Sequence, residues 1–156
     1  MDFDDFTALV DSPVYVVTAS ADGQRAGCLV GFAGQCSLDP VRFVVWLSKA
    51  NHTYLVARRT TVLAVHLLGQ DHELAVRFGA LCGAEADKFD GLALAEGPEG
   101  TPVLTDALAW FTGRVVDRFD GGDHVGFVLD PSTVRARDGE PLSLHQTLDI
   151  TAGHPA

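Results

Sequence analysis

The chain has 156 residues and a formal net charge of −10, with 47% hydrophobic and 21% charged residues. This length suits one domain with its own hydrophobic core, and the composition excludes extensive disorder, so we expect a single domain over residues 1–156. Because nucleic-acid backbones recruit basic surfaces, the acidic excess argues against general nucleic-acid binding.

The first half of the chain predicts one short helix followed by strands. Apolar residues between positions 3 and 10 share one face at helical spacing, and the β-branched run after Pro13 is typical of a strand. Asp22-Gly23 is a two-residue hairpin signal. In chain order we expect a helix within residues 2–10 and strands over 14–18, 25–32 and 41–47, the last apolar on both faces and therefore internal.

The second half adds two capped helices and a hairpin. Asn51 caps a predicted helix that runs to about residue 59, and Asp71 caps another on which Phe78 belongs to the apolar face. The Gly-rich, acidic stretch 83–100 predicts a loop. Further strands are expected over 61–68, 108–118 and 124–134, the last two joined across Asp120-Gly121-Gly122-Asp123 as a hairpin with a slightly long turn. About six strands with irregularly placed helices favour a mainly β fold, a closed antiparallel β-barrel with short helices.

One long window of the sequence lacks acidic residues. No Asp or Glu occurs from Pro40 to Gln70, and at its centre lies the stretch Ser48-Lys49-Ala50-Asn51-His52-Thr53. A lysine, hydroxyls and the free N–H groups of a helix start suit a phosphate. The same residues also fit an ordinary capped helix without a ligand.

A second unusual stretch runs from Gly27 to Pro40, where Gly27, Gly31 and Gly34 interrupt a strand-like sequence. Glycine inside a strand often marks a bulge or the close approach of another group to the backbone. A flat aromatic ligand edged by backbone amides fits this pattern. A barrel strand with bends fits it equally well.

Two histidines are singled out by their positions. His124 follows Gly121-Gly122 at a strand start, where it can point into a cleft or be merely solvated. His66 lies within a strand and is interpreted as a core or interface residue. The remaining histidines have no metal-ligand spacing, so no metal site is expected, and no G-x-S-x-G elbow supports hydrolytic chemistry.

Targeting signals and disulfides are not predicted. The acidic start of the chain lacks the basic and apolar regions of a signal peptide, and no apolar run approaches the roughly 18–20 residues of a membrane span. Cys28, Cys36 and Cys82 form no CxxC pair, and their odd number argues against a disulfide framework. We expect a cytoplasmic protein without membrane segments.

Taken in order, these stretches resemble the flavin reductase-like family of FMN-binding split-barrel proteins. The resemblance covers roughly Phe6 to Pro131. It rests on Pro-Val-Tyr-Val-Val-Thr at 13–18, on 27–40 against the family's G-x-T-x-x-S-F-x-S-V-S-L-D-P-P, on Phe78, on Gly97 to Leu104 against G-x-P-x-L, and on Gly122-Asp123-His124 against G-D-H.

The resemblance implies a Greek-key-like split-barrel homodimer that binds FMN, or alternatively FAD. It places Gly31, Phe32 and Ala33 along the flavin ring, and Gln35, Cys36 and Ser37 at its pyrimidine side and ribityl chain. It assigns the phosphate to Ser48, Lys49, Asn51, His52 and Thr53, with Phe78 over the phosphate end. His124 would lie beside the flavin and the nicotinamide. The family's Thr and two Ser fall here on Leu29, Gly31 and Gln35.

The function implied is an NAD(P)H-dependent flavin reductase in which a hydride passes from NADH or NADPH to the flavin. The reduced flavin would go to a partner monooxygenase or to oxygen. Two alternatives stay open at this point. One is a flavin-binding electron-transfer protein without a nicotinamide site, and the other is a split-barrel binding module for a different ligand, such as haem or a deazaflavin.

Overall fold

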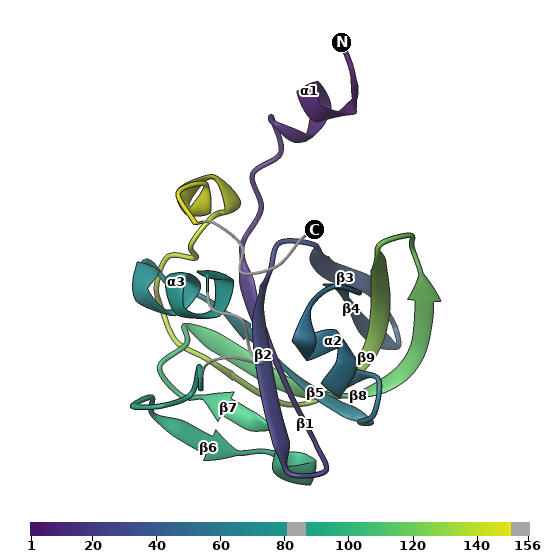
Figure 1. Ribbon diagram of the computed structural model, residues 1–156, viewed down its shortest axis with the longest axis vertical. Coiled ribbons are helices and arrows are strands. Elements are labelled where there is room, and N and C mark those ends of the chain that lie inside the picture. Colours follow the sequence, from purple (N-terminus) through teal and green to yellow (C-terminus); the bar gives the residue numbers. More distant parts are fainter. Residues whose placement is uncertain (81–86, 151–156) are drawn as a thin grey trace.

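The computed structural model describes residues 1–80 and 87–150, and its body is one curled antiparallel sheet (Figure 1). The strands of this sheet follow the order β2-β1-β5-β8-β9-β4-β3. Their bounds are β1 Tyr15–Ala21, β2 Gln24–Val30, β3 Ala33–Leu38, β4 Val41–Ser48, β5 Val62–Leu67, β8 Ala109–Asp120 and β9 His124–Ala136.

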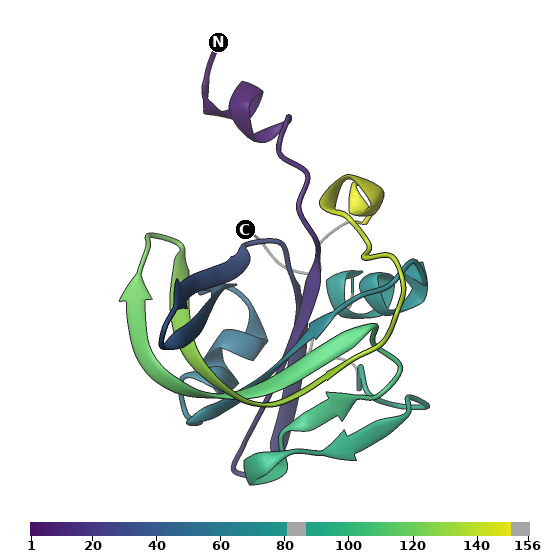
Figure 2. The same cartoon turned by 180° about the vertical axis from the view of Figure 1, so that it is seen from behind.

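Two hairpins predicted from turn residues are confirmed. Asp22 and Gly23 adopt φ angles of 52° and 77°, which a primed two-residue turn requires, and Ala21 pairs with Gln24. The second hairpin joins β8 and β9, the two longest strands, which Figure 2 shows from behind. The predicted strand over 41–47 is β4, which lies inside the sheet between β9 and β3.

The mainly β prediction is confirmed, but closure of the barrel is not. β2 and β3 are the two edges of the seven-stranded sheet, and no pairing joins them in the described parts of the chain. The expected strand number was too low as well. The glycine-interrupted stretch 27–40 holds the end of β2 and the whole of β3, because the chain turns at Gly31-Phe32 and β3 pairs with β4.

Two hydrophobic clusters lie on the two faces of the sheet. The first contains Val17, Val65 and Phe127, and α2 (His52–Ala57) covers it with Val56 and Ala57. The second contains Val16, Leu104 and Phe78, the last from α3 (His72–Ala80). Alternation along β1 therefore sends Val17 to one cluster and Val16 to the other. Figure 1 shows α2 and α3 on opposite sides of β2.

The acidic segment expected to be a loop holds short elements of its own. Residues 81–86 lie outside the described part of the chain, so the structure does not describe the start of that segment. Beyond it, β6 (Leu94–Glu96) pairs with β7 (Pro102–Leu104), and the single-turn helix η1 (Pro98–Gly100) joins them. Three-residue strands carry too little periodicity to be recognised in a sequence.

His66 ties this small sheet to the large one. Its side chain is fully buried, its Nδ1–H donates to the Val16 carbonyl at 2.9 Å, and its Nε2 accepts from the Leu104 N–H at 2.9 Å. Burial lowers the pKa of His66 to about 4, because the apolar surroundings penalise the imidazolium. The sequence-based interpretation of His66 as a core residue is confirmed.

The segment that follows α1 (Phe3–Thr7) meets the C-terminal tail close to the start of β1. α1 itself stands apart from the body in both views (Figures 1 and 2). Leu144, from the single-turn helix η2 (Leu144–Thr147), donates its N–H to the Ser12 carbonyl at 2.7 Å. Among the described residues, no helix combines the length and the apolar character that crossing a bilayer demands.

Candidate functional site

One pocket gathers residues from the three stretches that the sequence analysis singled out. Its volume is about 240 Å³, and we call it the β2–β4 pocket. Its lining combines apolar walls with a few polar side chains, as small-molecule sites do. The lining residues are Cys28, Leu29, Val30, Gly31, Phe32, Trp46, Leu47, Ser48, Asn51, His124 and Leu144.

Strand register brings the acid-free window next to the Gly-Gly turn. Ser48, at the end of β4, pairs with His124 at the start of β9, and the Lys49 N–H donates to the Asp123 carbonyl at 2.9 Å. These residues are more than seventy positions apart in the sequence. Gly31 and Phe32 reach the same place because the Trp46 N–H donates to the Phe32 carbonyl at 2.9 Å.

His124 lies at the pocket with both an aromatic and an acidic neighbour. Its ring centroid is 5.2 Å from that of Phe32, and its Nδ1 is 2.7 Å from Oδ1 of Asp123. The hydrogen bond from His124 holds the pKa of Asp123 below its ordinary value, so this carboxylate is ionised at neutral pH. An ionised acceptor keeps the proton on Nδ1 and fixes the orientation of the ring.

Trp46 is a lining residue that the sequence analysis missed. Its indole covers two glycines of the neighbouring hairpin, since a Cβ added to Gly126 or to Gly121 would lie 2.8 Å from indole carbons. The β8–β9 turn that carries His124 is therefore packed directly against this ring. Only the pairing of Trp46 with Gly126 across two strands reveals the fit, and a single sequence does not contain that register.

The residues predicted to bind a phosphate divide into two groups. Ser48 and Asn51 line the pocket, and Asn51 caps α2 as predicted by accepting from the Thr53 N–H at 2.8 Å. Lys49 and His52 are engaged elsewhere. The Lys49 ammonium donates to both carboxylate oxygens of Asp120, at 3.0 and 2.8 Å, and His52 Nε2 accepts from the Gln24 amide at 3.0 Å.

Thr53 is buried in the first turn of α2, beside the Cys28 thiol, whose pKa is raised to about 11 by burial. Asp120, the partner of Lys49, is the last residue of β8, directly before the turn between β8 and β9. The hydrogen bond from Lys49 and a second one from the Gly122 N–H lower its pKa. Lys49 therefore fastens the end of β4 to the turn that presents His124.

The other predicted flavin residues lie outside the lining of this pocket. Ala33 begins β3 and packs against the first cluster, while Gln35 and Cys36 are exposed on the same edge strand. Ser37 is half-buried there, and its carbonyl accepts from the Gln35 amide at 3.1 Å. Phe78 is buried in the second cluster, with its ring 5.4 Å from that of Phe89. Their predicted contacts with a flavin stay predictions.

Leu144 is another lining residue that the sequence analysis missed. It comes from the C-terminal tail, where no periodic pattern predicts an element, and a Cβ on Gly31 would lie 3.1 Å from its Cδ1. Within residues 1–80 and 87–150, no three His, Cys, Asp or Glu side chains are grouped so that they could hold a metal ion.

Comparisons with known proteins find similarity to flavin reductases. A family model described as "Flavin reductase like domain" matches residues 7–148. The reductase component of a 4-nitrophenol 4-monooxygenase/4-nitrocatechol 2-monooxygenase from Rhodococcus opacus is 33% identical over 135 residues, which cover 86% of this chain and 71% of that protein. The FMN reductase (NADH) SmoA from Agrobacterium fabrum is 33% identical over 131 residues, covering 83% and 72%.

A solved structure has the same fold. The crystal structure of a flavin reductase domain protein from Arthrobacter sp. FB24 superposes with a TM-score of 0.83, over 99% of this chain and 94% of that chain. The sequence identity in this match is 24%, so it supports the arrangement of strands and not a shared activity.

Proposed function

The chain belongs to the flavin reductase-like domain family, and we propose that it is an NAD(P)H:flavin oxidoreductase that passes a hydride from NADH or NADPH to FMN or FAD. The observation that carries the proposal is the convergence of Gly31, Phe32, Ser48, Asn51 and His124 on one pocket. Two relatives point the same way, because one is named a reductase component of a monooxygenase and the other an FMN reductase that uses NADH.

The chemistry of the β2–β4 pocket fits a flavin. Apolar walls from Val30, Leu47 and Leu144 suit an aromatic ring, and the polar side chains of Ser48 and Asn51 suit a ribityl chain or a phosphate. When bound, the flavin supplies the hydride-accepting centre, and the protein contributes binding and orientation. Backbone amides at Gly31 and Phe32 would meet the polar edge of the ring, in place of the family's side-chain hydroxyls.

His124 is the residue that we assign to the reacting end of the pocket. Asp123 holds its Nδ1–H, so Nε2 is the atom directed to a ligand, and Phe32 packs against the ring. We assign His124 to positioning the nicotinamide and to stabilising charge on the complex. A proton transfer by His124 is not part of the proposal.

The proposal also covers the partner, the oligomeric state and the cellular location of the enzyme. Reduced flavin would pass to a flavin-dependent monooxygenase, in line with the relative from Rhodococcus opacus. We propose a split-barrel homodimer as the working form. Its nicotinamide donors belong to the cytoplasmic coenzyme pool, which is where we propose that it acts.

The test is oxidation of NADH and NADPH by the purified protein, followed through nicotinamide absorbance with and without added FMN. Protein-dependent turnover is expected, and its dependence on added flavin would mark the flavin as a substrate. Absence of turnover in protein that binds flavin would overturn the reductase assignment and favour an electron carrier.

A matched pair of variants tests His124. We expect His124→Ala to lose about tenfold or more in kcat/KM for NADH, within the range of positioning groups. His72→Ala is the control, because His72 lies on α3 and pairs with Asp149 at 3.2 Å, away from the pocket. Equal turnover in both variants would contradict the role of His124.

A further inference from the structure

The N-terminal arm, residues 1–12, forms a helix that the described residues of its own chain leave uncovered. α1 spans only five residues, and Asp2 and Asp5 close a complete capping box at its start. Isolated helices shorter than about 12–15 residues are marginal in water, so a five-residue helix needs a surface to pack on. None of the residues of α1 is buried.

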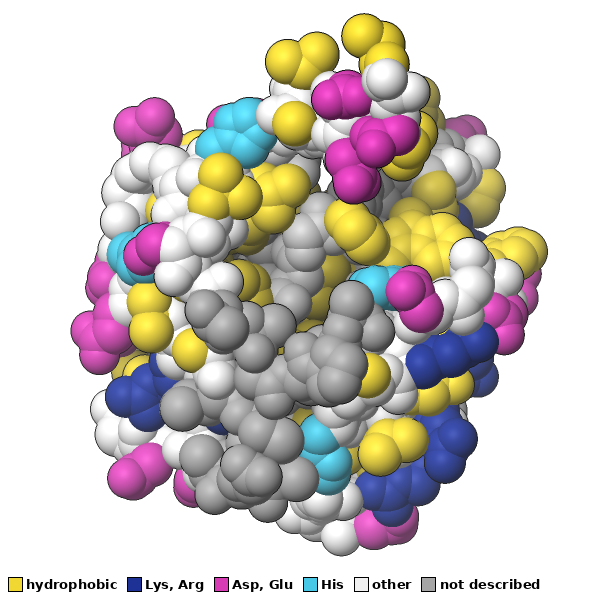
Figure 3. All heavy atoms as spheres, turned by 45° about the horizontal axis from the view of Figure 1, so that its top comes forward, with side chains coloured by type: hydrophobic (Ala, Val, Ile, Leu, Met, Phe, Trp, Pro, Cys, Tyr) yellow, Lys and Arg dark blue, Asp and Glu magenta, His cyan; other side chains and the backbone are white. Residues whose placement is uncertain are grey.

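The arm also carries an apolar face in an otherwise acidic segment. Phe3 and Phe6 stack with ring centroids 5.5 Å apart and remain 73% and 63% exposed, and Leu9 is 85% exposed. Figure 3 looks onto this end of the molecule and shows hydrophobic and acidic side chains side by side on the projecting arm. Large apolar side chains gathered in this way mark an interaction surface.

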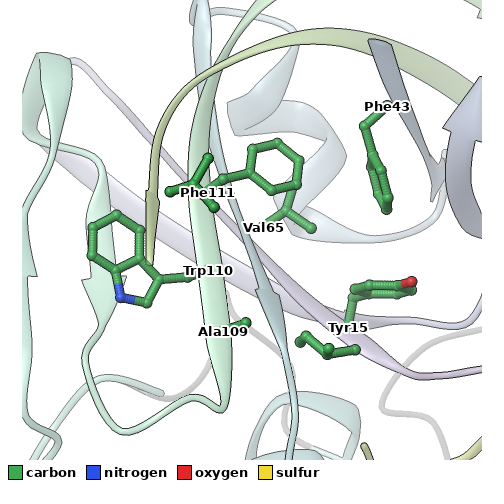
Figure 4. Close-up of a pocket in the computed structure, with 8 residues that line it drawn as sticks. Tyr15, Phe43, Val65, Ala109, Trp110 and Phe111 are labelled. Atoms are coloured by element: carbon green, nitrogen blue, oxygen red, sulfur yellow. The ribbon is translucent and has the colours of Figure 1, made fainter. Parts of the chain in front are cut away.

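The body has an apolar hollow of matching chemistry, which we call the aromatic hollow. Its volume is about 220 Å³, and Figure 4 shows Tyr15, Phe43 and Phe111 arranged around the same space. Their rings meet edge to face, with centroids 5.7 Å apart for Tyr15 and Phe43 and 5.3 Å apart for Phe43 and Phe111. Val134 forms its rim and is 56% exposed.

The Tyr15 hydroxyl and the Trp110 indole N–H are the polar side-chain groups among the described residues that line the hollow, too few to orient a flavin or a nucleotide. Every residue that lines it is apolar or aromatic, in contrast to Ser48, Asn51 and His124 in the β2–β4 pocket. The charges nearby favour the arm. Residues 1–12 contain four aspartates and no basic residue, whereas the Arg135 guanidinium donates to the Val134 carbonyl at 2.9 Å, at the rim of the hollow.

The arm of one chain does not fill the aromatic hollow of that same chain, because its base and the hollow lie on opposite faces of the sheet. Its base is fastened to the C-terminal tail, since the His145 N–H donates to Asp11 at 2.9 Å and the Leu144 N–H donates to Ser12. Leu144 packs against the second cluster, whereas Tyr15, Phe43 and Phe111 pack against the first. These anchors direct the arm away from its own hollow.

We propose that the arm of each protomer docks in the aromatic hollow of a second copy of this chain, with Phe3 and Phe6 as the anchoring side chains. An exchange of this kind is isologous, because one docked arm generates the second by two-fold symmetry. It covers both apolar surfaces without any further partner. The inference rests on the homodimer proposed above and assigns the surfaces that form it.

The first measurement is the dimer dissociation constant by sedimentation. The double variant Phe3→Ser/Phe6→Ser is expected to raise it at least about 100-fold, since four buried phenyl groups are removed per dimer. Leu148→Ser is the control, because Leu148 is 78% exposed and lies outside the arm and the hollow. A dimer that is unchanged by the arm substitutions would overturn the inference.

The decisive measurement is a disulfide between two differently tagged, co-expressed chains in a Cys36→Ser/Cys82→Ser background. One chain carries Thr7→Cys, next to the anchoring Phe6 on α1, and the other Val134→Cys, and oxidation is expected to join them. A chain with Phe32→Cys in place of Val134→Cys is expected not to crosslink, and preferential crosslinking there would overturn the inference.

The same samples separate the two proposals. A monomeric parent protein would overturn both the homodimer and the docking of the arm, whatever its turnover. A dimeric parent without a Thr7→Cys to Val134→Cys crosslink would overturn the docking alone. Reductase activity is measured independently of either result.

Discussion

His66 and His124 are the same side chain in two opposite surroundings. His66 is completely enclosed where β1, β5 and β7 meet, and both ring nitrogens bond to backbone groups. His124 lies on the turn before β9, at the edge of the β2–β4 pocket, with an ionised carboxylate and an aromatic ring beside it. The first is built into the folded state, whereas the second has an atom left for a ligand. The difference separates a structural histidine from the one that we propose to be functional more clearly than sequence spacing does.

The largest expected effect comes from removing the imidazole of His66. His66→Ala leaves the Val16 carbonyl and the Leu104 N–H without their partner in a dry interior and opens a cavity, so a loss of about 3–5 kcal/mol in the free energy of unfolding is expected. Chemical denaturation measures it. His124→Ala should cost less than about 1 kcal/mol, and equal losses in the two variants would erase the contrast.

The acid sensitivity of the fold should also come from His66. Its pKa is about 4 in the folded protein against 6.5 for an unperturbed histidine, so only the unfolded chain takes up a proton between these values. Stability is therefore fully present above pH 6.5 and falls as the pH drops toward 4, by roughly 3 kcal/mol in total. Denaturation of the parent protein at several pH values tests this slope.

His66→Gln is the matched comparison for that slope. A glutamine amide offers a donor and an acceptor for the same two backbone groups but does not titrate. The difference in stability between parent and variant should shrink as the pH falls from 6.5 to 4, because only the parent loses stability through this group. A difference that is constant over this range would show that His66 is not the titrating residue.

The next largest effect on stability is expected where the Trp46 indole packs against the hairpin that carries His124. A methyl group at Gly126 would lie 2.8 Å from the Trp46 indole, so Gly126→Ala should destabilise the fold by about 1–3 kcal/mol. Trp46→Leu in the same chain should relieve much of that loss, which a double-mutant cycle measures. Gly34→Ala is the control, since a Cβ there meets no atom within 4 Å. Additive losses would mean that the indole does not hold the hairpin.

The sequence predicted those parts of the fold that local chemistry determines. Asp22-Gly23 gave the first hairpin, Asn51 and Asp71 accept hydrogen bonds at the starts of α2 and α3, and Phe78 faces the core. β3 was not predicted as a separate strand, because Gly31 and Gly34 break the alternation of side chains on which strand prediction depends. β6 and β7 were not predicted, because three residues are too few to show the alternating pattern of a strand.

Apart from His124, which the family resemblance placed at the site, the lining was predictable only where neighbours in sequence are also neighbours in space. Ser48 with Asn51, and Gly31 with Phe32, were found in this way. Trp46 and Leu144 were not, because their places depend on strand register and on the path of the C-terminal tail. The bond from Lys49 to Asp120 spans 71 positions, and nothing in the residues around Lys49 indicates it.

The smallest expected effect concerns the hydrogen bond between Lys49 and Asp120. Its test decides between two candidate partners of the Lys49 ammonium, Asp120 and the flavin phosphate. In the structure it fastens Asp120, an exposed pair that contributes little to stability. In the proposed enzyme it would reach the flavin phosphate, where one charge-assisted hydrogen bond corresponds to roughly tenfold in affinity. Lys49→Gln should then weaken binding of FMN about tenfold and leave riboflavin unaffected, which a fluorescence titration with both flavins measures.

Asp120→Asn distinguishes the two roles of Lys49. This substitution frees the ammonium without removing it, so binding of FMN should stay equal to that of the parent or become tighter. If Lys49 acts only by holding the turn before His124, both substitutions release that turn and weaken FMN and riboflavin alike. A loss confined to FMN and to Lys49→Gln therefore assigns the ammonium to the phosphate, and through it ties the acid-free window to the same pocket as His124.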